Sequence, residues 1–170
     1  WTEIVGGPAR TRLGGRERSG KMAGLRPAMS TFKAGRPVVA ANPVGVARAA
    51  LEETIRFARK TDLLGRARVR DRIETISRKI RMARLVCLRA GQLADEARPN
   101  IIEASMSKAM AAQVAQEATS AGLELVGVTG GRGDYLIEKL YRDAKAMDIV
   151  EGTGQIQRMI ISRSLVGLPR

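Results

Sequence analysis

The strongest constraint on the fold is a run of small and aliphatic residues that recur at alternating intervals of three and four positions. The run consists of Ile73, Ile76, Ile80, Ala83, Cys87, Ala90, Ala94 and Ala97. This spacing lines one side of a long helix that packs nearly parallel to a neighbouring helix. A second run with smaller side chains follows Pro99: Ala104, Ser107, Ala111, Val114, Ala118, Ala121 and Leu125. The two runs predict two long helices whose backbones approach each other closely.

Three further segments favour helices: residues 38–60, 136–147 and 155–168. A weaker helical pattern begins near Met22 and Leu25, and Pro37 and Pro43 should kink the first helix or mark its first turn. Glycines cluster in the connections, and no alternating β-pattern occurs. We therefore predict an all-α, four-helix up-and-down bundle over residues 22–170, preceded by a basic Gly/Arg-rich arm over residues 1–21.

The amino-acid composition limits the kinds of core and active site that the chain can form. Hydrophobic residues make up 44% of the chain but aromatic residues only 3%, which suits closely packed helices with a core of Ala, Leu, Ile, Val and Met. The single cysteine and the absence of histidine exclude a disulfide scaffold, the usual zinc ligand sets and histidine-dependent catalysis. We predict no metal site, an inert core thiol at Cys87, and no membrane span, because no apolar run approaches about 18 residues.

The charge points to an anionic partner. Thirty basic residues against seventeen acidic ones give a net charge of +13, which fits nucleic acid, an acidic protein or a phosphate-rich cofactor. Between Arg66 and Arg89 the basic residues outnumber the two acidic ones, Asp71 and Glu74. This stretch lacks aromatic side chains on which bases could stack. A nucleic-acid-binding helical protein therefore remains an alternative that the sequence disfavours, and a solvated helix face explains the same charges.

The turn at residues 149–155 is the most suggestive place for catalysis. Glu151 lies between aliphatic residues and a glycine-flanked turn that opens a helix, and a poorly hydrated carboxylate there could act as a general base. Thr153 can cap the helix, whose first N–H groups suit an anion such as phosphate. On these residues alone, a helix cap with one solvated glutamate is the more common explanation. The glycine-rich loop at 127–133 could admit a pyrophosphate, although an ordinary turn explains it too.

Three stretches resemble the C-terminal half of the acyl-CoA dehydrogenases: FKAGRPVVAANPVGVARAALEETIRFARKT, ASMSKAMAAQVAQEA and EKLYRDAKAMDIVEGTGQIQRMIISR. The similarity covers roughly residues 22–167, and its last block, RDAK followed by I-x-EGT-x-QIQR, is highly specific. The resemblance implies a four-helix bundle that forms much of a tetramer contact. It also implies an FAD-dependent enzyme that oxidises acyl-CoA to 2-enoyl-CoA and passes electrons to an electron-transfer flavoprotein.

The resemblance also implies roles for individual residues. Glu151 matches the catalytic base that removes the α-proton, and the flavin contacts that follow it match Gly152, Thr153 and Gln155. Arg59 matches the arginine that reaches the flavin diphosphate of a neighbouring subunit. The remaining matches are Gly127 and Gly130 on the adenosine side of the flavin, and Phe32 and Arg36 where the family holds the CoA nucleotide.

Some residues depart from the family's pattern. Arg70 stands where the family has glutamine, Glu124 leads the glycine loop in place of glutamine, and Val128 replaces its second glycine. Family members are also about twice as long, with a helical domain and a β-domain before this region. We therefore expect catalysis only when those domains are supplied by a parent chain or a partner, in a homo- or hetero-oligomer that is a tetramer or a dimer. The alternative is a non-catalytic, oligomerising bundle derived from the family. The excess of arginine over lysine fits the bacterial cytoplasm, and a eukaryotic source would imply the mitochondrial matrix.

Overall fold

The computed structural model of the chain describes residues 25–168, and the side chains of residues 35–130 and 132–168 within them. The predicted arm at residues 1–21 and the side chain of Phe32 lie outside this description. The elements follow one another as five α-helices and two short 3-10 helices: α2 Leu25–Lys60, η1 Leu63–Gly65, α3 Ala67–Asp95, α4 Ile101–Val126, η2 Gly127–Arg132, α5 Leu136–Ile149 and α6 Gly154–Leu165. The described part of the chain contains no strand, so the predicted all-α class is confirmed.

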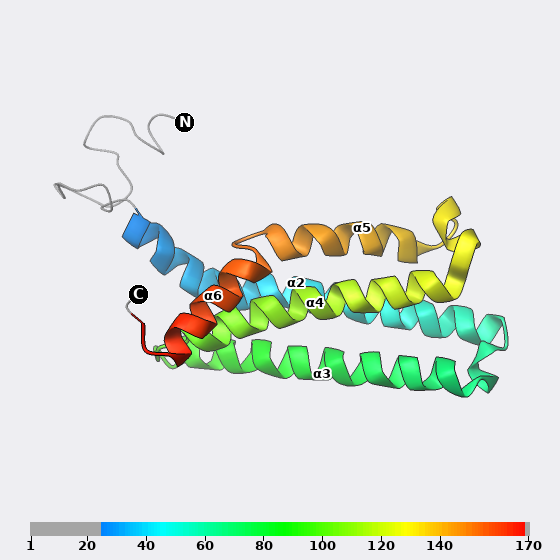
Figure 1. Cartoon of the computed structure of the whole chain (residues 1–170), viewed down its shortest axis with the longest axis horizontal. Coiled ribbons are helices and arrows are strands. Elements are labelled where there is room, and N and C mark those ends of the chain that lie inside the picture. The colour runs from blue at the N-terminus through cyan, green and yellow to red at the C-terminus, as the bar shows by residue number, and fades with distance from the viewer. Residues whose placement is uncertain (1–24, 169–170) are drawn as a thin grey trace, which may run out of the picture.

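The four helices α2 to α5 run alternately in opposite directions along one long axis, and α6 lies across α4 near one end (Figure 1). The predicted up-and-down bundle is thus confirmed, with α6 as a fifth helix. The first helix is longer than its strongest pattern indicated, since α2 begins at Leu25 and contains both Pro37 and Pro43. None of the helices in residues 25–168 has the length and apolarity needed to cross a membrane.

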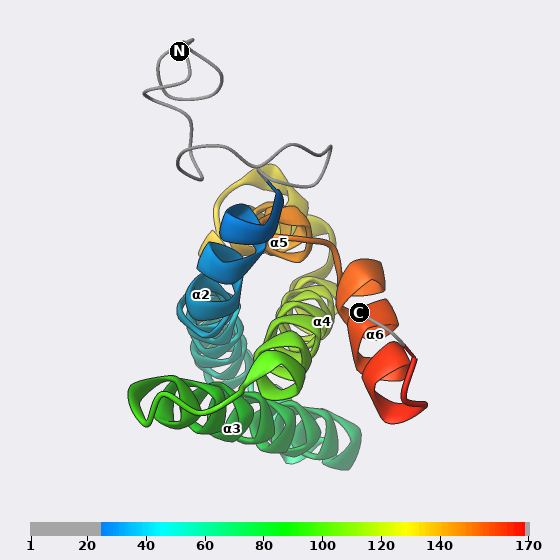
Figure 2. The same ribbon diagram turned by 90° about the vertical axis from the view of Figure 1, so that its left-hand side faces the viewer.

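The central element of the bundle is α4. Seen from the end of the molecule, it lies among α2, α3, α5 and α6 (Figure 2), and it contacts all four. Six of the seven residues predicted to line it are buried, together with neighbours such as Ala112, Ala115 and Thr119. Small side chains buried around most of the circumference explain how four helices fit around it. Glycine is needed at one crossing, because a β-carbon at Gly122 would lie 2.5 Å from Thr54 Oγ1 and 2.7 Å from Ile137 Cδ1.

The predicted lining of α3 is confirmed except at its two ends. Ile76, Ile80, Ala83, Cys87 and Ala90 are buried in the described bundle, and burial raises the pKa of the Cys87 thiol to about 11, as expected of an inert core thiol. Ile73 is half-buried, whereas Ala94 and Ala97 are exposed and Leu93 is buried in their place. The helix ends at Asp95, and Ala97 reverses the chain with a φ of 51°. Ala97 lies beyond the end of the helix, so the regular spacing cannot include it.

Candidate functional site

The connection between α5 and α6 is a tight turn with unusual backbone angles. The last backbone hydrogen bond of α5 runs from the Val150 N–H to the Ala146 carbonyl. Glu151 then adopts a φ of 56° and Gly152 a φ of 100°, and the left-handed conformation is costly for the non-glycine residue. The Thr153 hydroxyl accepts a hydrogen bond from the Ile156 N–H at 3.5 Å, so the predicted cap of α6 is confirmed. The turn therefore holds Glu151 in one defined orientation.

The side chain of Glu151 lies against α2. A β-carbon built on Gly35 would be only 3.0 Å and 3.1 Å from the two carboxylate oxygens of Glu151. Oε2 of Glu151 is buried without a hydrogen-bond partner among the residues that the structure describes. A carboxylate oxygen of this kind is poorly hydrated and has its proton-accepting capacity unused.

Arg36, next to Gly35 on α2, is buried close to this carboxylate. Its side chain is 3% exposed, and its Nε and Nη1 have no hydrogen-bond partner within residues 35–168. Burial lowers the pKa of the Arg36 guanidinium, and the attraction of the Glu151 carboxylate opposes that change. The base candidate and a buried cation are thus electrostatically coupled.

A second cation reaches the turn from α4. The side chain of Lys108 is fully buried, and its Nζ donates a hydrogen bond of 2.6 Å to the Met147 carbonyl in the last turn of α5. Burial lowers the pKa of the Lys108 ammonium, while the carboxylates of Asp148 and Glu151 act in the opposite direction.

Gln157, on α6, holds the turn from the other side. It is fully buried, and its Nε2 donates to the carbonyls of Gly152 at 3.2 Å and Glu151 at 3.4 Å. A β-carbon at Gly152 would lie 2.8 Å from the same Nε2, so these two hydrogen bonds of Gln157, which we call the Gln157 clamp, require glycine at position 152. Sequence reasoning gave no role to Gln157 or Lys108. Their signals were a glutamine within the QIQR block and a lone lysine beside the small-residue run of α4.

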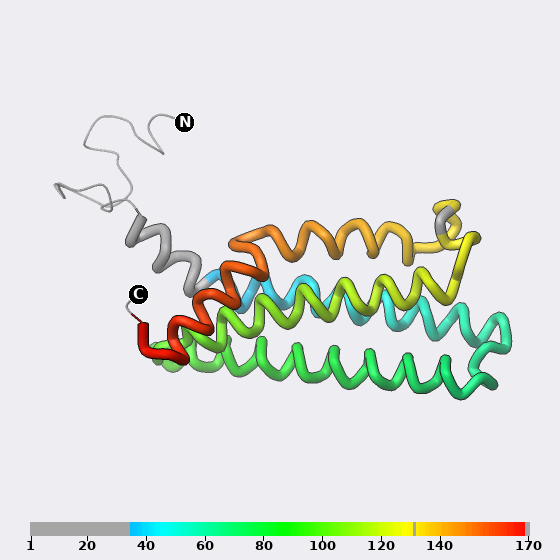
Figure 3. Tube along the Cα trace, in the orientation of Figure 1, coloured from blue at the N-terminus to red at the C-terminus, as the bar shows by residue number. Residues whose placement is uncertain are grey.

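The predicted site residues fall into two groups. Glu151, Gly152 and Thr153 form the turn, Gln155 is exposed on the first turn of α6, and Arg36 joins them from α2. We call this the Glu151 end of the bundle. The other group comes from the last turn of α2, which contains Arg59, and from η2, which contains Gly127 and Gly130. Both segments lie at the opposite end of the bundle (Figure 3). At 1.5 Å per residue, Arg36 and Arg59 are separated by roughly 35 Å along α2.

We call the second group the Arg59 end. Arg59 is exposed and lines a shallow depression of about 480 Å³ with Glu52, Ile55 and Arg56. Gly127 ends α4 with a φ of 65°, and nothing lies within 4 Å of a β-carbon built on it. Gly130 packs on Val126 and Leu123. A larger cleft of about 630 Å³ opens nearby between α2, α3 and α4, and Arg68, Arg72 and Glu124 contribute to its lining.

Arg70, which departs from the family's pattern, closes the α2–α3 connection. Its Nη1 donates to the carbonyls of Leu64 at 2.7 Å and Gly65 at 2.9 Å. This guanidinium is therefore used within the chain. Among residues 25–168 there is also no group of three or more potential metal-ligating side chains.

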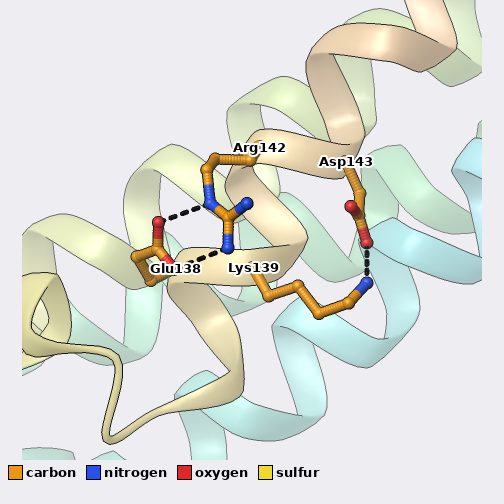
Figure 4. Close-up of polar contacts among 4 residues, drawn as sticks. All are labelled: Glu138, Lys139, Arg142 and Asp143. Atoms are coloured by element: carbon orange, nitrogen blue, oxygen red, sulfur yellow. Dashed lines mark hydrogen bonds and ion pairs between the residues drawn. The ribbon is translucent and has the colours of Figure 1, made fainter.

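The RDAK block lies on α5, immediately before the turn. Its Arg142 binds the carboxylate of Glu138 through two hydrogen bonds, of 2.6 Å and 3.2 Å, and Asp143 pairs with Lys139 (Figure 4). Each pair is separated by four residues and lies on one face of the helix. These charges stabilise the helix that presents the Glu151 turn and take no part in the buried cluster.

Comparison with known proteins places this arrangement in a family. The sequence profile described as "Acyl-CoA dehydrogenase, C-terminal domain" matches residues 22–166. The chain is 32% identical over 148 residues to a probable acyl-CoA dehydrogenase, YngJ, of Bacillus subtilis, and 34% identical over 149 residues to the caffeyl-CoA reductase-Etf complex subunit CarC of Acetobacterium woodii. Each alignment covers 84% of this chain and 39% of the relative. The fold matches that of butyryl-CoA dehydrogenase from Megasphaera elsdenii with a TM-score of 0.85 and 28% identity, over 94% of this chain and 42% of that one.

Proposed function

The chain belongs to the acyl-CoA dehydrogenase family, and we propose that it acts as the C-terminal helical domain of an FAD-dependent enzyme that oxidises acyl-CoA to 2-enoyl-CoA. The observation that carries this proposal is the Glu151 carboxylate, held in a left-handed turn against Gly35 with one oxygen buried and unpaired. The chain spans about two fifths of the length of the curated relatives that it matches, so the activity belongs to the enzyme assembled with the remaining domains.

Glu151 is the proposed general base. The α-proton of a thioester is only weakly acidic, so its removal needs a carboxylate that is poorly hydrated and fixed in direction. The turn supplies both conditions, because Lys108 and Gln157 hold its backbone and α2 covers one carboxylate oxygen. The nearby Arg36 cation keeps a compensating charge beside the base when it is ionised.

The residues around the turn fit a flavin on two observations. The N-terminus of α6 offers N–H groups beyond the one that Thr153 caps, and buried polar atoms of Arg36, Glu151 and Gln157 lack partners within the described residues. We propose that Gly152, Thr153 and Gln155 contact FAD, which when bound supplies the acceptor for the β-hydride. Arg59, Gly127 and Gly130 are proposed to bind the phosphate and adenosine parts of another subunit's FAD, because they lie at the opposite end of the bundle.

Phe32 and Arg36 are the proposed contacts to acyl-CoA. The burial of Arg36 beside Glu151 favours the thioester end of the substrate over the nucleotide for this guanidinium. The proposed electron acceptor is an electron-transfer flavoprotein, which the similarity to a subunit of a reductase-Etf complex supports.

The test is Glu151→Gln in the assembled enzyme, with Glu138→Gln as the matched control. Glu151→Gln keeps the shape but removes the proton acceptor, so dehydrogenation of acyl-CoA should fall by about 10³-fold or more while the visible flavin spectrum remains. Glu138 forms a surface ion pair on α5, the helix that precedes the turn, and its variant should retain activity. Activity that survives Glu151→Gln would remove Glu151 from the role of base.

One surface supports the alternative of an oligomerising bundle without activity. Met82, Leu85 and Leu88 form an exposed apolar stripe on α3, each more than half exposed. The test incubates the chain with FAD, removes free flavin by desalting, and measures flavin absorbance and mass in solution. Retained flavin in an oligomer supports the enzyme domain, whereas an oligomer without flavin favours either a fragment of the enzyme or a structural bundle derived from it.

A further inference from the structure

Lys108 is a buried charge that takes no direct part in the proposed proton transfer. It is the largest of the fully buried side chains in the described residues, and its helical neighbours Ala104, Ala111 and Ala112 are small and buried. Burying an ammonium away from water is unfavourable, and an aliphatic side chain would fill this space without that penalty. The buried Lys108 ammonium therefore needs a specific hydrogen-bond acceptor.

That acceptor is a carbonyl at the end of α5. The last four carbonyls of a helix lack backbone donors, and Val150 N–H serves the one at Ala146. The next carbonyl, at Met147, would receive the N–H of Glu151 if the helix continued. It receives instead the Lys108 ammonium at 2.6 Å, and Glu151 leaves the helix with its φ of 56°. A lysine from another helix thus occupies the acceptor that one more turn of α5 would use.

The charges around Lys108 favour the same arrangement. A cation is stabilised at the C-terminus of a helix, and the carboxylates of Asp148 and Glu151 both attract it. The lysine therefore contacts the backbone just before the turn and attracts the carboxylate that the turn presents.

We infer that Lys108 is a positioning residue for Glu151: its ammonium ends α5 at Ile149 and so directs the Glu151 carboxylate toward Gly35. This inference rests on the proposed role of Glu151 for its catalytic meaning. Its structural content, the hold of Lys108 on the turn, can be measured without any activity.

The experiment compares Lys108→Met with Lys79→Met. Both lysines make one hydrogen bond between helices, but Lys79 on α3 bonds Glu117 of α4, away from the turn. Amide hydrogen exchange of the whole chain, followed by mass spectrometry of peptides, should show about ten-fold faster exchange at residues 148–153 in Lys108→Met and unchanged exchange there in Lys79→Met. Peptides from the middle of α3 and α4 should stay protected in Lys108→Met, because methionine fills a similar apolar space.

In the assembled enzyme, Lys108→Met should lower kcat by about 10- to 100-fold with little change in KM for acyl-CoA and with the flavin retained. A lysine that merely stabilised the bundle would loosen all peptides alike and leave kcat per folded molecule unchanged. That result would overturn the inference, as would unchanged exchange at 148–153.

Two further outcomes, a Lys108→Met variant that does not fold and a Glu151→Gln variant that stays active, also have defined meanings. If Lys108→Met does not fold, Lys108→Gln retains a neutral donor, and exchange at 148–153 intermediate between wild type and an unprotected peptide supports the inference, whereas uniform loosening contradicts it. If Glu151→Gln remains active while exchange at 148–153 responds to Lys108, the proposed base is wrong and the hold on the turn still stands.

Discussion

The two ends of the bundle differ in how much of a site they complete by themselves. At the Glu151 end, three helices converge on one turn, and buried side chains of Arg36, Lys108 and Gln157 surround it. At the Arg59 end, the residues matched to the same cofactor are an exposed arginine and two glycines of a short connection. The first end is organised within one chain, and the second presents a surface that another molecule must cover.

The difference follows from what each end has to do. A base must be held in a fixed direction in a poorly hydrated place, which requires buried contacts on every side. Residues that bind only the phosphate of a ligand, while other parts of the protein bind the rest of it, need exposed hydrogen-bond donors. They also need a backbone that the phosphate can approach closely. Three of the four predictions below compare substitutions that are alike in chemistry but differ in location, and the expected effects on stability decrease from the first to the last.

The largest effect is expected from the glycines with positive φ. Gly152→Ala combines backbone strain with a contact of 2.8 Å to Gln157 Nε2, so it should lower the free energy of unfolding by about 2–4 kcal/mol. Gly127→Ala meets nothing within 4 Å and should cost only the backbone strain, about 1–2 kcal/mol. Urea unfolding of both variants measures the difference. Equal losses would show that the Gln157 clamp does not tighten the Glu151 end.

A second pair tests how closely Glu151 lies against α2. Gly45→Ala, at an exposed position with free space, should stabilise the helix by about 0.5–1 kcal/mol. Gly35→Ala should lose that gain, because its β-carbon would meet the Glu151 oxygens at 3.0–3.1 Å and the carboxylate must shift. In the assembled enzyme this shift should lower kcat by about ten-fold or more, while Gly45→Ala leaves kcat unchanged. Equal stabilisation by both alanines would mean that the carboxylate does not lie over Gly35.

Sequence patterns predicted the helices of the bundle and the turn that contains Glu151. They did not predict the side-chain contacts that hold this turn. The runs in α3 and α4 predicted both long helices, because burial recurs with the helical period. Thr153 as a cap followed from local chemistry as well. The hold of Lys108 on Met147 joins residues 39 positions apart, and no local pattern specifies which carbonyl a buried lysine reaches. The convergence of Arg36 with Glu151 depends likewise on how α2 packs beside the turn.

A smaller effect concerns an ion pair that belongs to neither end. Lys79 Nζ lies 2.5 Å from Glu117 Oε2, and this hydrogen bond, more than any other interaction, holds the pKa of the Glu117 carboxyl below its ordinary value of 4.5. The lowered pKa means that the pair stabilises the fold above about pH 4.5, and that this contribution is lost as the pH falls through the folded-state value. Both side chains are partly exposed, so the contribution should be about 0.2–1 kcal/mol.

Glu117→Gln provides the measurement. Urea unfolding of wild type and variant at neutral pH should differ by that amount, and the two should converge in acid because the wild-type carboxyl is then protonated. A difference that persists unchanged below the folded-state pKa would assign the effect to packing and not to charge. Glu117→Gln, like Lys79→Met, should leave hydrogen exchange at the Glu151 turn unchanged.

The smallest effect on stability is expected at the Arg59 end. Arg59 is exposed, so Arg59→Met should change the free energy of unfolding by less than about 0.5 kcal/mol. If Arg59 binds a flavin phosphate of another subunit, the same change should weaken FAD retention by about ten-fold or more. Hydrogen bonds between charged groups contribute more to binding than hydrogen bonds between neutral groups. Arg56→Met is the matched control, because Arg56 lines the same depression but pairs with Glu53. FAD retention in the assembled oligomer, measured by absorbance after desalting, should fall for Arg59→Met alone. Loss of stability in Arg59→Met, or equal loss of flavin in both variants, would contradict a specific role of Arg59 in binding FAD. Such a result would mean that Arg59 stabilises the folded bundle itself.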